Sequence, residues 1–238
     1  MEVLVVGNTA YVDDDFCAKA FPGDHVQVVA AAEARRDESS PHASWKELLQ
    51  HLDQAYEFDR VVYLSNYLTP HTDTVGYIEL LRSVFRACAG RRVQLLYVAG
   101  PVGAEGAVDA AGRTGKGIIA RAANDLCRYY AAREGVQTKI LRVPFLYTAS
   151  AALEDPFLVP LFDACSTGSV ALQGAQDAAF PLLCAEELAV LVRRIFDSWD
   201  ASFETLDVAD TFHHASGEVG EALKALFPGL SVAYGDSA

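Results

Sequence analysis

Apolar positions along the chain change their spacing at regular intervals between Glu2 and Val143. Short apolar runs predict buried strands, and the segments between them have the three- and four-residue spacing of helices. The strands are expected at Glu2–Val6, His25–Ala30, Arg60–Leu64, Val93–Ala99 and Lys139–Val143, and the helices at Asp14–Ala20, Ser44–Tyr56, Val75–Ala89 and Gly117–Glu134. Strands that alternate with helices predict a parallel sheet with helices on both of its faces.

The pattern becomes less regular after Pro144. It predicts a helix, a strand and a second helix, at Glu186–Ser198, Phe203–Val208 and Ser216–Phe227. The segments Arg35–His42 and Pro101–Gly115 are polar or rich in glycine and alanine, so we expect loops there.

The composition is that of a globular protein, because hydrophobic residues make up 51% of the 238 and disfavour disorder. A net charge of −13 disfavours nucleic acid and anionic membranes as partners. The apolar runs are too short to span a bilayer, and the N-terminal strand lacks the basic segment of a signal peptide. The five cysteines have no Cys-x-x-Cys spacing, so we expect free, mostly buried thiols, no metal site and a cytoplasmic location.

The first strand runs into a glycine-opened turn and then a helix, which is typical of a dinucleotide-binding βα unit. In that unit one glycine makes the tight turn, a second lets the backbone approach a pyrophosphate, and a third packs the helix on the strand. Gly7 keeps the first position, whereas Ala10 and Asp13 hold the second and the third. If a nucleotide binds, the amides of Gly7, Asn8 and Thr9 are the candidates for its phosphates. The alternative is a tight turn without a ligand.

Three consecutive carboxylates, Asp13, Asp14 and Asp15, follow at the start of the first helix. Acidic side chains complement the positive end of the helix dipole, and here they occupy the place that a pyrophosphate would otherwise use. The βα unit therefore indicates a nucleotide-binding fold and, a few residues later, disfavours ordinary nucleotide binding.

Four segments further along the chain resemble known motifs, and their order and spacing together carry the resemblance. They are Gly76–Leu81 for Gly-Thr-x-Asn-Leu-Leu, Leu96–Gly100 for a strand ending in Ser-Ser, Ile140–Tyr147 for Leu-Arg-Pro-x-x-Val-Tyr-Gly and Phe180–Ala189 for Val-x-Asp-Val-Ala. In this respect nearly the whole chain resembles the extended short-chain dehydrogenase/reductase family, of the NAD-dependent epimerase/dehydratase type. The resemblance implies a Rossmann-type doubly wound parallel sheet in residues 1–150. It also implies a reduced C-terminal substrate lobe in residues 151–238, interleaved with the core in a single compact domain.

The residues that this family uses in catalysis are absent. The resemblance places its catalytic Ser or Thr at Pro101, and the Tyr and Lys of its Tyr-x-x-x-Lys dyad at Lys116 and Ala120. No Tyr-x-x-x-Lys occurs anywhere in the chain. The acidic residue that should hold the adenosine ribose is replaced by the apolar segment 29–32. Arg35 is the candidate for holding a 2′-phosphate, and a solvated loop side chain is the alternative.

Three residues remain as candidates for chemistry in the old cleft. Lys116 is a candidate base, Schiff-base amine or anion anchor, with an exposed position on a flexible basic segment as the alternative. Tyr147 follows the fifth strand, at the carboxyl edge where α/β sheets bind ligands. His213 lies near the substrate lobe in the family's layout. Adjacent residues such as His213 and His214 point in different directions, which disfavours a shared metal.

These observations leave three functions open. The first is a degenerate member that performs no hydride transfer, needs no cofactor and acts as a binding, regulatory or assembly subunit, with a small molecule or a protein in the cleft region. The second is an oxidoreductase or epimerase that uses NAD or NADP in an atypical site. The third is a repurposed, cofactor-independent isomerase, cyclase or dehydratase.

The resemblance also implies an oligomer. Active relatives pair two long helices across a dimer axis, and these correspond to Val75–Ala89 and Gly117–Glu134. Apolar residues on the outer faces of both helices would favour a homodimer, or a heterodimer with an active paralogue.

Overall fold

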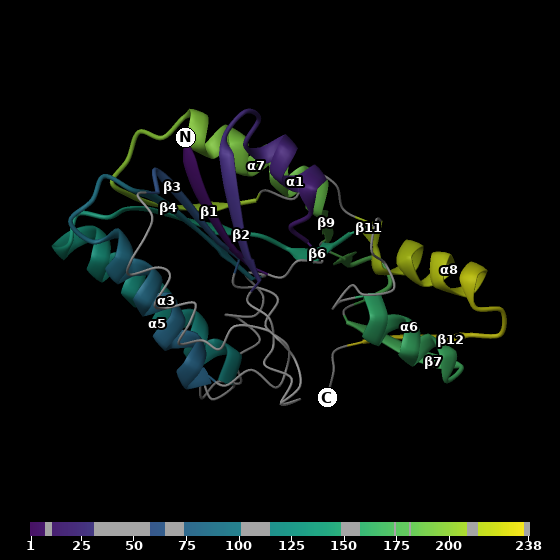
Figure 1. The fold of residues 1–238 in the computed structure, drawn as a ribbon. Helices are drawn as coiled ribbons and strands as arrows, with labels where there is room; N and C mark the ends of the chain where they lie inside the picture. Colours follow the sequence, from purple (N-terminus) through teal and green to yellow (C-terminus); the bar gives the residue numbers. More distant parts are fainter. Residues whose placement is uncertain are drawn as a thin grey trace, which may run out of the picture.

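The chain folds into a sheet flanked by helices, with a smaller lobe beside it (Figure 1). This is a computed structural model, and it describes residues 1–7, 11–30, 58–64, 74–100, 115–148, 158–173, 175–180, 182–208 and 214–235. The expected helix Ser44–Tyr56 and the expected loops Arg35–His42 and Pro101–Gly115 fall on or largely within the remaining residues, outside the described part.

Six parallel strands of the described part form the central sheet, in the order β10-β5-β4-β3-β1-β2. Their bounds are Glu2–Gly7 (β1), His25–Ala30 (β2), Arg60–Leu64 (β3), Gln94–Ala99 (β4), Gln137–Arg142 (β5) and Phe203–Asp207 (β10). The predicted parallel α/β sheet is therefore confirmed, and each of these strands lies within two residues of its expected position.

Helices cover both faces of this sheet, as predicted (Figure 1). Helices α1 (Asp14–Ala20) and α7 (Ala185–Asp197) pack on one face, and α3 (Thr74–Cys88) and α5 (Gly115–Arg133) pack side by side on the other. Helix α5 begins two residues before the expected start, so Lys116 belongs to the helix and not to the preceding loop.

Alternation along the strands divides the interior into two cores, because successive side chains of a strand point to opposite faces. Val3, Val5 and Val62 point toward α1 and α7, whereas Leu4 and Val61 point toward α3 and α5. Every one of these five side chains is 1% exposed or less. Strands β1 and β3 are thus buried on both faces, which explains why their sequences are almost continuously apolar.

The second half of the chain contributes to two layers. Helix α7 and strand β10 complete the main sheet layer, while α6, β7, α8 and β12 form a lobe with its own core. The lobe elements are Leu158–Ser166 (α6), Ser169–Gln173 (β7), Ser216–Leu226 (α8) and Ser231–Gly235 (β12), and its buried side chains are Cys165, Val170, Leu172, Leu223 and Leu230. Strand β12 pairs in parallel with β7.

Two further pairs of short strands are formed by segments that connect elements of the main sheet layer with elements of the lobe. Strand β6 (Phe145–Tyr147) pairs with β9 (Leu182–Cys184), and β8 (Ala179–Phe180) pairs with β11 (His214–Ala215). The sequence pattern predicts none of α6, β6, β7, β11 or β12. Strands β6 and β11 are too short to show a clear period, and Pro160 in the first turn of α6 hides a helical run.

The five cysteines are free, as expected, and Cys88, Cys127 and Cys165 are buried. Among the helices of the described residues, none combines the length and the apolar character that a membrane crossing would need.

Candidate functional site

The carboxyl edge of the sheet is the place where this topology would put a ligand. Strand β1 lies between β2 and β3, so the chain moves from one side of β1 to the other at this point. Open α/β sheets bind ligands at the carboxyl ends of the strands beside such a switch point. Here these ends are Gly7 on β1 and Leu64 on β3.

Gly7 is held closely against its neighbouring strand. A Cβ atom at Gly7 would lie 2.9 Å from Cδ1 and 3.0 Å from Cβ of Leu64. Because real Cβ atoms keep a greater distance, glycine at this position is explained by the contact between β1 and β3. Asn8 and Thr9, the other candidates for phosphate binding, lie outside the described residues.

The N-terminus of α1, where the fold would place a pyrophosphate, is capped by the chain's own carboxylate. Oδ1 of Asp13 accepts a hydrogen bond of 2.8 Å from the Phe16 amide. Asp14 and Asp15 add two further carboxylates in the first turn, and Asp15 pairs with Lys19 at 2.5 Å. An anion would have to displace the cap and would meet three negative charges, so these residues do not fit a dinucleotide pyrophosphate.

Tyr147 lies half-buried in β6, opposite Cys184 of β9. The Cys184 thiol donates a hydrogen bond to the Glu186 carboxylate, and Tyr147 lies beside this pair. Glu187 accepts a hydrogen bond of 3.2 Å from the Cys184 amide and caps the start of α7.

The surroundings of Tyr147 favour its neutral form. Burial raises the pKa of the Tyr147 phenol, and the neighbouring Cys184 and Glu187 raise it further. Burial and the hydrogen bond to Glu186 also raise the pKa of the Cys184 thiol. A general base or nucleophile needs the opposite shift, toward a lower pKa, so both groups remain protonated near neutral pH.

The side chains of the other three candidate residues lie outside the described part of the structure. Lys116 is the second residue of α5, but its side chain lies outside the described part, and so do Arg35 and His213. Sequence reasoning missed Cys184 and Glu186 as partners of Tyr147. No local pattern reveals them, because β6 and β9 are far apart in the chain and only their pairing brings the residues together.

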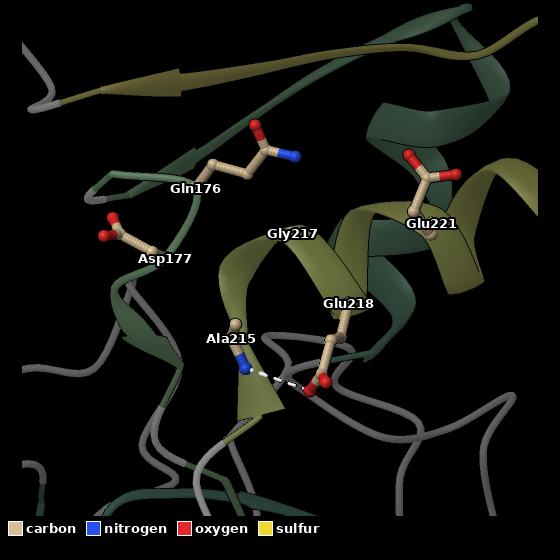
Figure 2. A pocket seen from close by; sticks show the side chains of 6 residues that line it. All are labelled: Gln176, Asp177, Ala215, Gly217, Glu218 and Glu221. Atoms are coloured by element: carbon tan, nitrogen blue, oxygen red, sulfur yellow. Dashed lines mark hydrogen bonds between the residues drawn. The ribbon is translucent and has the colours of Figure 1, made fainter.

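The small lobe has an open hollow at the start of α8 (Figure 2). Its lining residues are Gln176, Asp177, Ala215, Gly217, Glu218 and Glu221. Gln176 and Asp177 come from the segment after β7, and Glu218 accepts a 3.2 Å hydrogen bond from the Ala215 amide (Figure 2). The lining holds three carboxylates and no basic side chain, so its charge disfavours a phosphate-bearing ligand.

Neither a protein-family model nor a curated protein matches the sequence. Solved structures do match the fold. DesIV, a dTDP-glucose 4,6-dehydratase from Streptomyces venezuelae with NAD and TYD bound, has a TM-score of 0.71 at 13% identity, over 100% of this chain and 85% of that one. UDP-glucuronic acid 4-epimerase from Bacillus cereus, in complex with NAD, has a TM-score of 0.68 at 12% identity, over 99% and 90%. The chain therefore shares the fold of these two proteins.

A third structure with the same fold, UDP-N-acetylglucosamine 4-epimerase from Bacillus cereus, has a TM-score of 0.67 at 15% identity, over 99% of this chain and 86% of that one. The predicted resemblance of fold is thereby confirmed over essentially the full chain. Helix α5 starts at Gly115, so Lys116 and Ala120, the positions at which the sequence resemblance puts the Tyr-x-x-x-Lys dyad, lie in its first two turns.

Proposed function

We propose that this chain is a non-catalytic binding, regulatory or assembly subunit built on the short-chain dehydrogenase fold. The observation that carries the proposal is the Asp13 carboxylate on the Phe16 amide, at the helix terminus that would otherwise receive a pyrophosphate. A cofactor phosphate would lose the attraction of the α1 N-terminus and gain repulsion from Asp13, Asp14 and Asp15.

The state of the catalytic groups supports the same proposal. The chain contains no Tyr-x-x-x-Lys, so no lysine stands where it would lower the pKa of a tyrosine. Tyr147 on β6 has a pKa raised by burial and by the neighbouring Cys184, so it keeps its proton. Loss of the dyad and loss of the phosphate site are separate changes, and together they favour binding without hydride transfer.

An NAD(P)-dependent oxidoreductase or epimerase with an atypical site is the second candidate. Two of the similar structures hold NAD, and the switch point beside Gly7 is preserved in this chain. This function requires that the cofactor reach the cleft by contacts other than those at the start of α1. A repurposed cofactor-independent enzyme stays a sequence prediction that depends on Lys116 and His213.

Calorimetric titration of purified, nucleotide-stripped protein separates the two candidates. With NAD⁺, NADH, NADP⁺ and NADPH in turn, we expect no heat of binding at millimolar cofactor. One-to-one binding of any of them at micromolar affinity would refute the proposal and establish the oxidoreductase as the function to pursue.

A variant tests the cause directly. In Asp13→Gly combined with Asp14→Ala, the carboxylate cap is removed and the glycine of the dinucleotide motif is restored. Weak cofactor binding that appears only in this variant would attribute the loss of the site to these carboxylates. The matched control is Glu79→Ala combined with Asp125→Ala, which removes two exposed carboxylates from α3 and α5 on the opposite face of the sheet and should bind no better than the wild type.

A further inference from the structure

The outer face of the helix pair α3–α5 is rich in arginine. Helix α3 exposes Arg82 and Arg86, and α5 exposes Arg121, Arg128 and Arg133. We call these five residues the arginine face. The two helices pack side by side on one face of the sheet, so the solvent-exposed sides of both form one continuous surface (Figure 1).

The charge of this face is opposite to that of the whole protein. Over 78–88 and 121–133, where side chains are described, the helices carry five arginines, two carboxylates (Glu79 and Asp125) and no lysine. The complete chain has a net charge of −13. The positive charge is therefore concentrated on one layer of an acidic molecule, where it can steer an acidic partner.

An exposed aromatic side chain, Tyr129, follows Arg128 on α5. Tyr129 is 53% exposed, and its ring lies edge-on to Tyr130 with 5.3 Å between centroids. Tyr130 is buried and stacks on Phe85 of α3 at 4.8 Å. A surface tyrosine supported by a core ring loses little entropy on binding. Tyrosine and arginine are also the residues that contribute most to protein interfaces, in which lysine is depleted.

Two other occupants fit this face less well. A symmetric dimer through α3 and α5 would place the arginine face against its own copy, with five arginines and only two carboxylates on each side. A nucleic acid would extend beyond the two helices and meet the acidic remainder of the chain. A carboxylate-rich protein surface of limited size has neither disadvantage.

We propose that the arginine face and Tyr129 bind a carboxylate-rich surface on a different protein. Arginine forks pair with carboxylates through two parallel hydrogen bonds, which lysine cannot make. Helix α5 has 19 residues and is about 28 Å long, which suits a helix-sized acidic segment. This inference goes beyond the proposed function, because it holds whether or not the cleft binds a cofactor.

The probe for this site is a fluorescent glutamate-rich peptide of about 20 residues, which matches the length of α5 when helical. Its anisotropy is measured with the full chain at about 0.05 M salt and again at about 0.15 M, where the Debye length is about 8 Å. The test variant is Arg82→Glu with Arg86→Glu. The matched control is Arg193→Glu with Arg194→Glu on α7, which makes the same change of charge at two exposed arginines of the opposite layer.

We expect the wild type to bind the peptide, with an affinity that falls as salt rises. The test variant should lose about tenfold or more in affinity and the control less than about threefold, since a direct charge contact acts within a Debye length. Tyr129→Ala should weaken binding without a change in salt dependence, which distinguishes a contact from bulk charge.

Several results would overturn the proposal. They are equal losses in the test and control variants, absence of peptide binding at low salt, or tighter binding of single-stranded DNA of the same charge. Sedimentation that shows a wild-type dimer abolished by Arg82→Glu with Arg86→Glu would assign the face to a second copy. The cofactor titration is a separate measurement, so failure of one proposal is distinguishable from failure of the other.

Discussion

The two faces of the central sheet bury different chemistry, although the same strands supply both. The face under α3 and α5 buries mainly apolar side chains, aromatic rings and thiols, and no charged side chain is found in its described core. Phe85 stacks on Tyr130 at 4.8 Å, and Tyr63 stacks on Tyr97 at 5.9 Å. The charged side chains of α3 and α5, including the arginine face, lie on the solvent side of these helices.

The face under α1 and α7 contains buried or half-buried cationic side chains. Nζ of Lys139, which is 3% exposed, lies 2.7 Å from Glu204, 3.2 Å from Asp200 and 5.3 Å from the centroid of Trp199. Trp199 stacks on Phe196 at 5.3 Å, and the Arg60 guanidinium lies 5.0 Å from the Phe196 ring. Two rings are thus held between two cations, which is favourable when the cations are partly desolvated.

The alternation of apolar and polar residues predicts where a strand lies. It does not specify which buried groups on each face of the sheet need polar partners. Both faces receive alternate residues of the same strands, but a buried cation requires partners that come from another element. Lys139 finds them on β10 and on the segment before it, far along the chain. Four changes test whether one face depends on packing and the other on pairing.

The largest effect is expected on the apolar face. Phe85 is fully buried, so Phe85→Ala leaves a cavity and removes the stack on Tyr130. The free energy of unfolding should fall by about 3–5 kcal/mol in chemical denaturation. Phe85→Leu should cost clearly less, because most of the volume is kept. If both variants lose the same free energy of unfolding, the ring stack and not the packing volume explains the effect.

On the cationic face, Lys139 separates packing from pairing. Lys139→Ala should lower the free energy of unfolding by about 3 kcal/mol, since it removes a buried aliphatic stem as well as the charge. Lys139→Met keeps the stem and removes the cost of burying an ammonium, so we expect it to stay within about 1 kcal/mol of the wild type.

Burial lowers the pKa of Lys139, but Glu204 and Asp200 outweigh it and the net shift is upward. The ammonium is therefore present at neutral pH, and urea titrations of both Lys139 variants there are a fair test. If Lys139→Met loses as much as Lys139→Ala, pairing and not packing stabilises this face.

The main sheet could be predicted from the sequence because its central strands β1, β3 and β4 are nearly continuous apolar runs bounded by polar or glycine residues. For α1, β2 and β3 the expected bounds coincide with those of the structure. The carboxylates at the start of α1 were also expected from the sequence, as complements to the positive end of the helix dipole, and the structure adds that Asp13 caps the helix. These features are encoded within a few neighbouring residues.

The lobe and the surroundings of Tyr147 could not be predicted, because long-range pairing creates them. Strand β12 is held by β7 and its side chains alternate between exposed and half-buried, so it lacks a clear apolar signal. The contact between Tyr147 and Cys184 exists only because β6 pairs with β9. The site therefore depends on the part of the fold that local patterns describe least.

Alkaline pH tests the thiols of the apolar face. Burial raises the pKa of the Cys88 thiol to about 12 from the ordinary value of 9.0. The unfolded chain loses this proton from pH 9 upward while the native state keeps it, so the free energy of unfolding falls as pH rises between these values. Cys88→Ala should reduce that fall by about 2 kcal/mol between pH 9 and about pH 11.

Val84→Ala is the control for this effect, because it opens a cavity on the same helix without removing a titrating group. It should lower the free energy of unfolding equally at each pH. A pH dependence in Cys88→Ala that matches the wild type would mean that the thiol ionises in the native state.

The smallest effect is expected at Asp13, on the face with α1 and α7. Asp13→Ala leaves the Phe16 amide without its cap and should lower the free energy of unfolding by about 1 kcal/mol. Asp13→Asn should retain most of the stability, because an asparagine side chain caps a helix nearly as well. Asp15→Ala removes only an exposed pair with Lys19 and should change stability less than Asp13→Ala. If Asp13→Ala proves neutral while Asp15→Ala does not, the carboxylate at 13 is not held as a cap, and the argument that it excludes a pyrophosphate loses its structural basis.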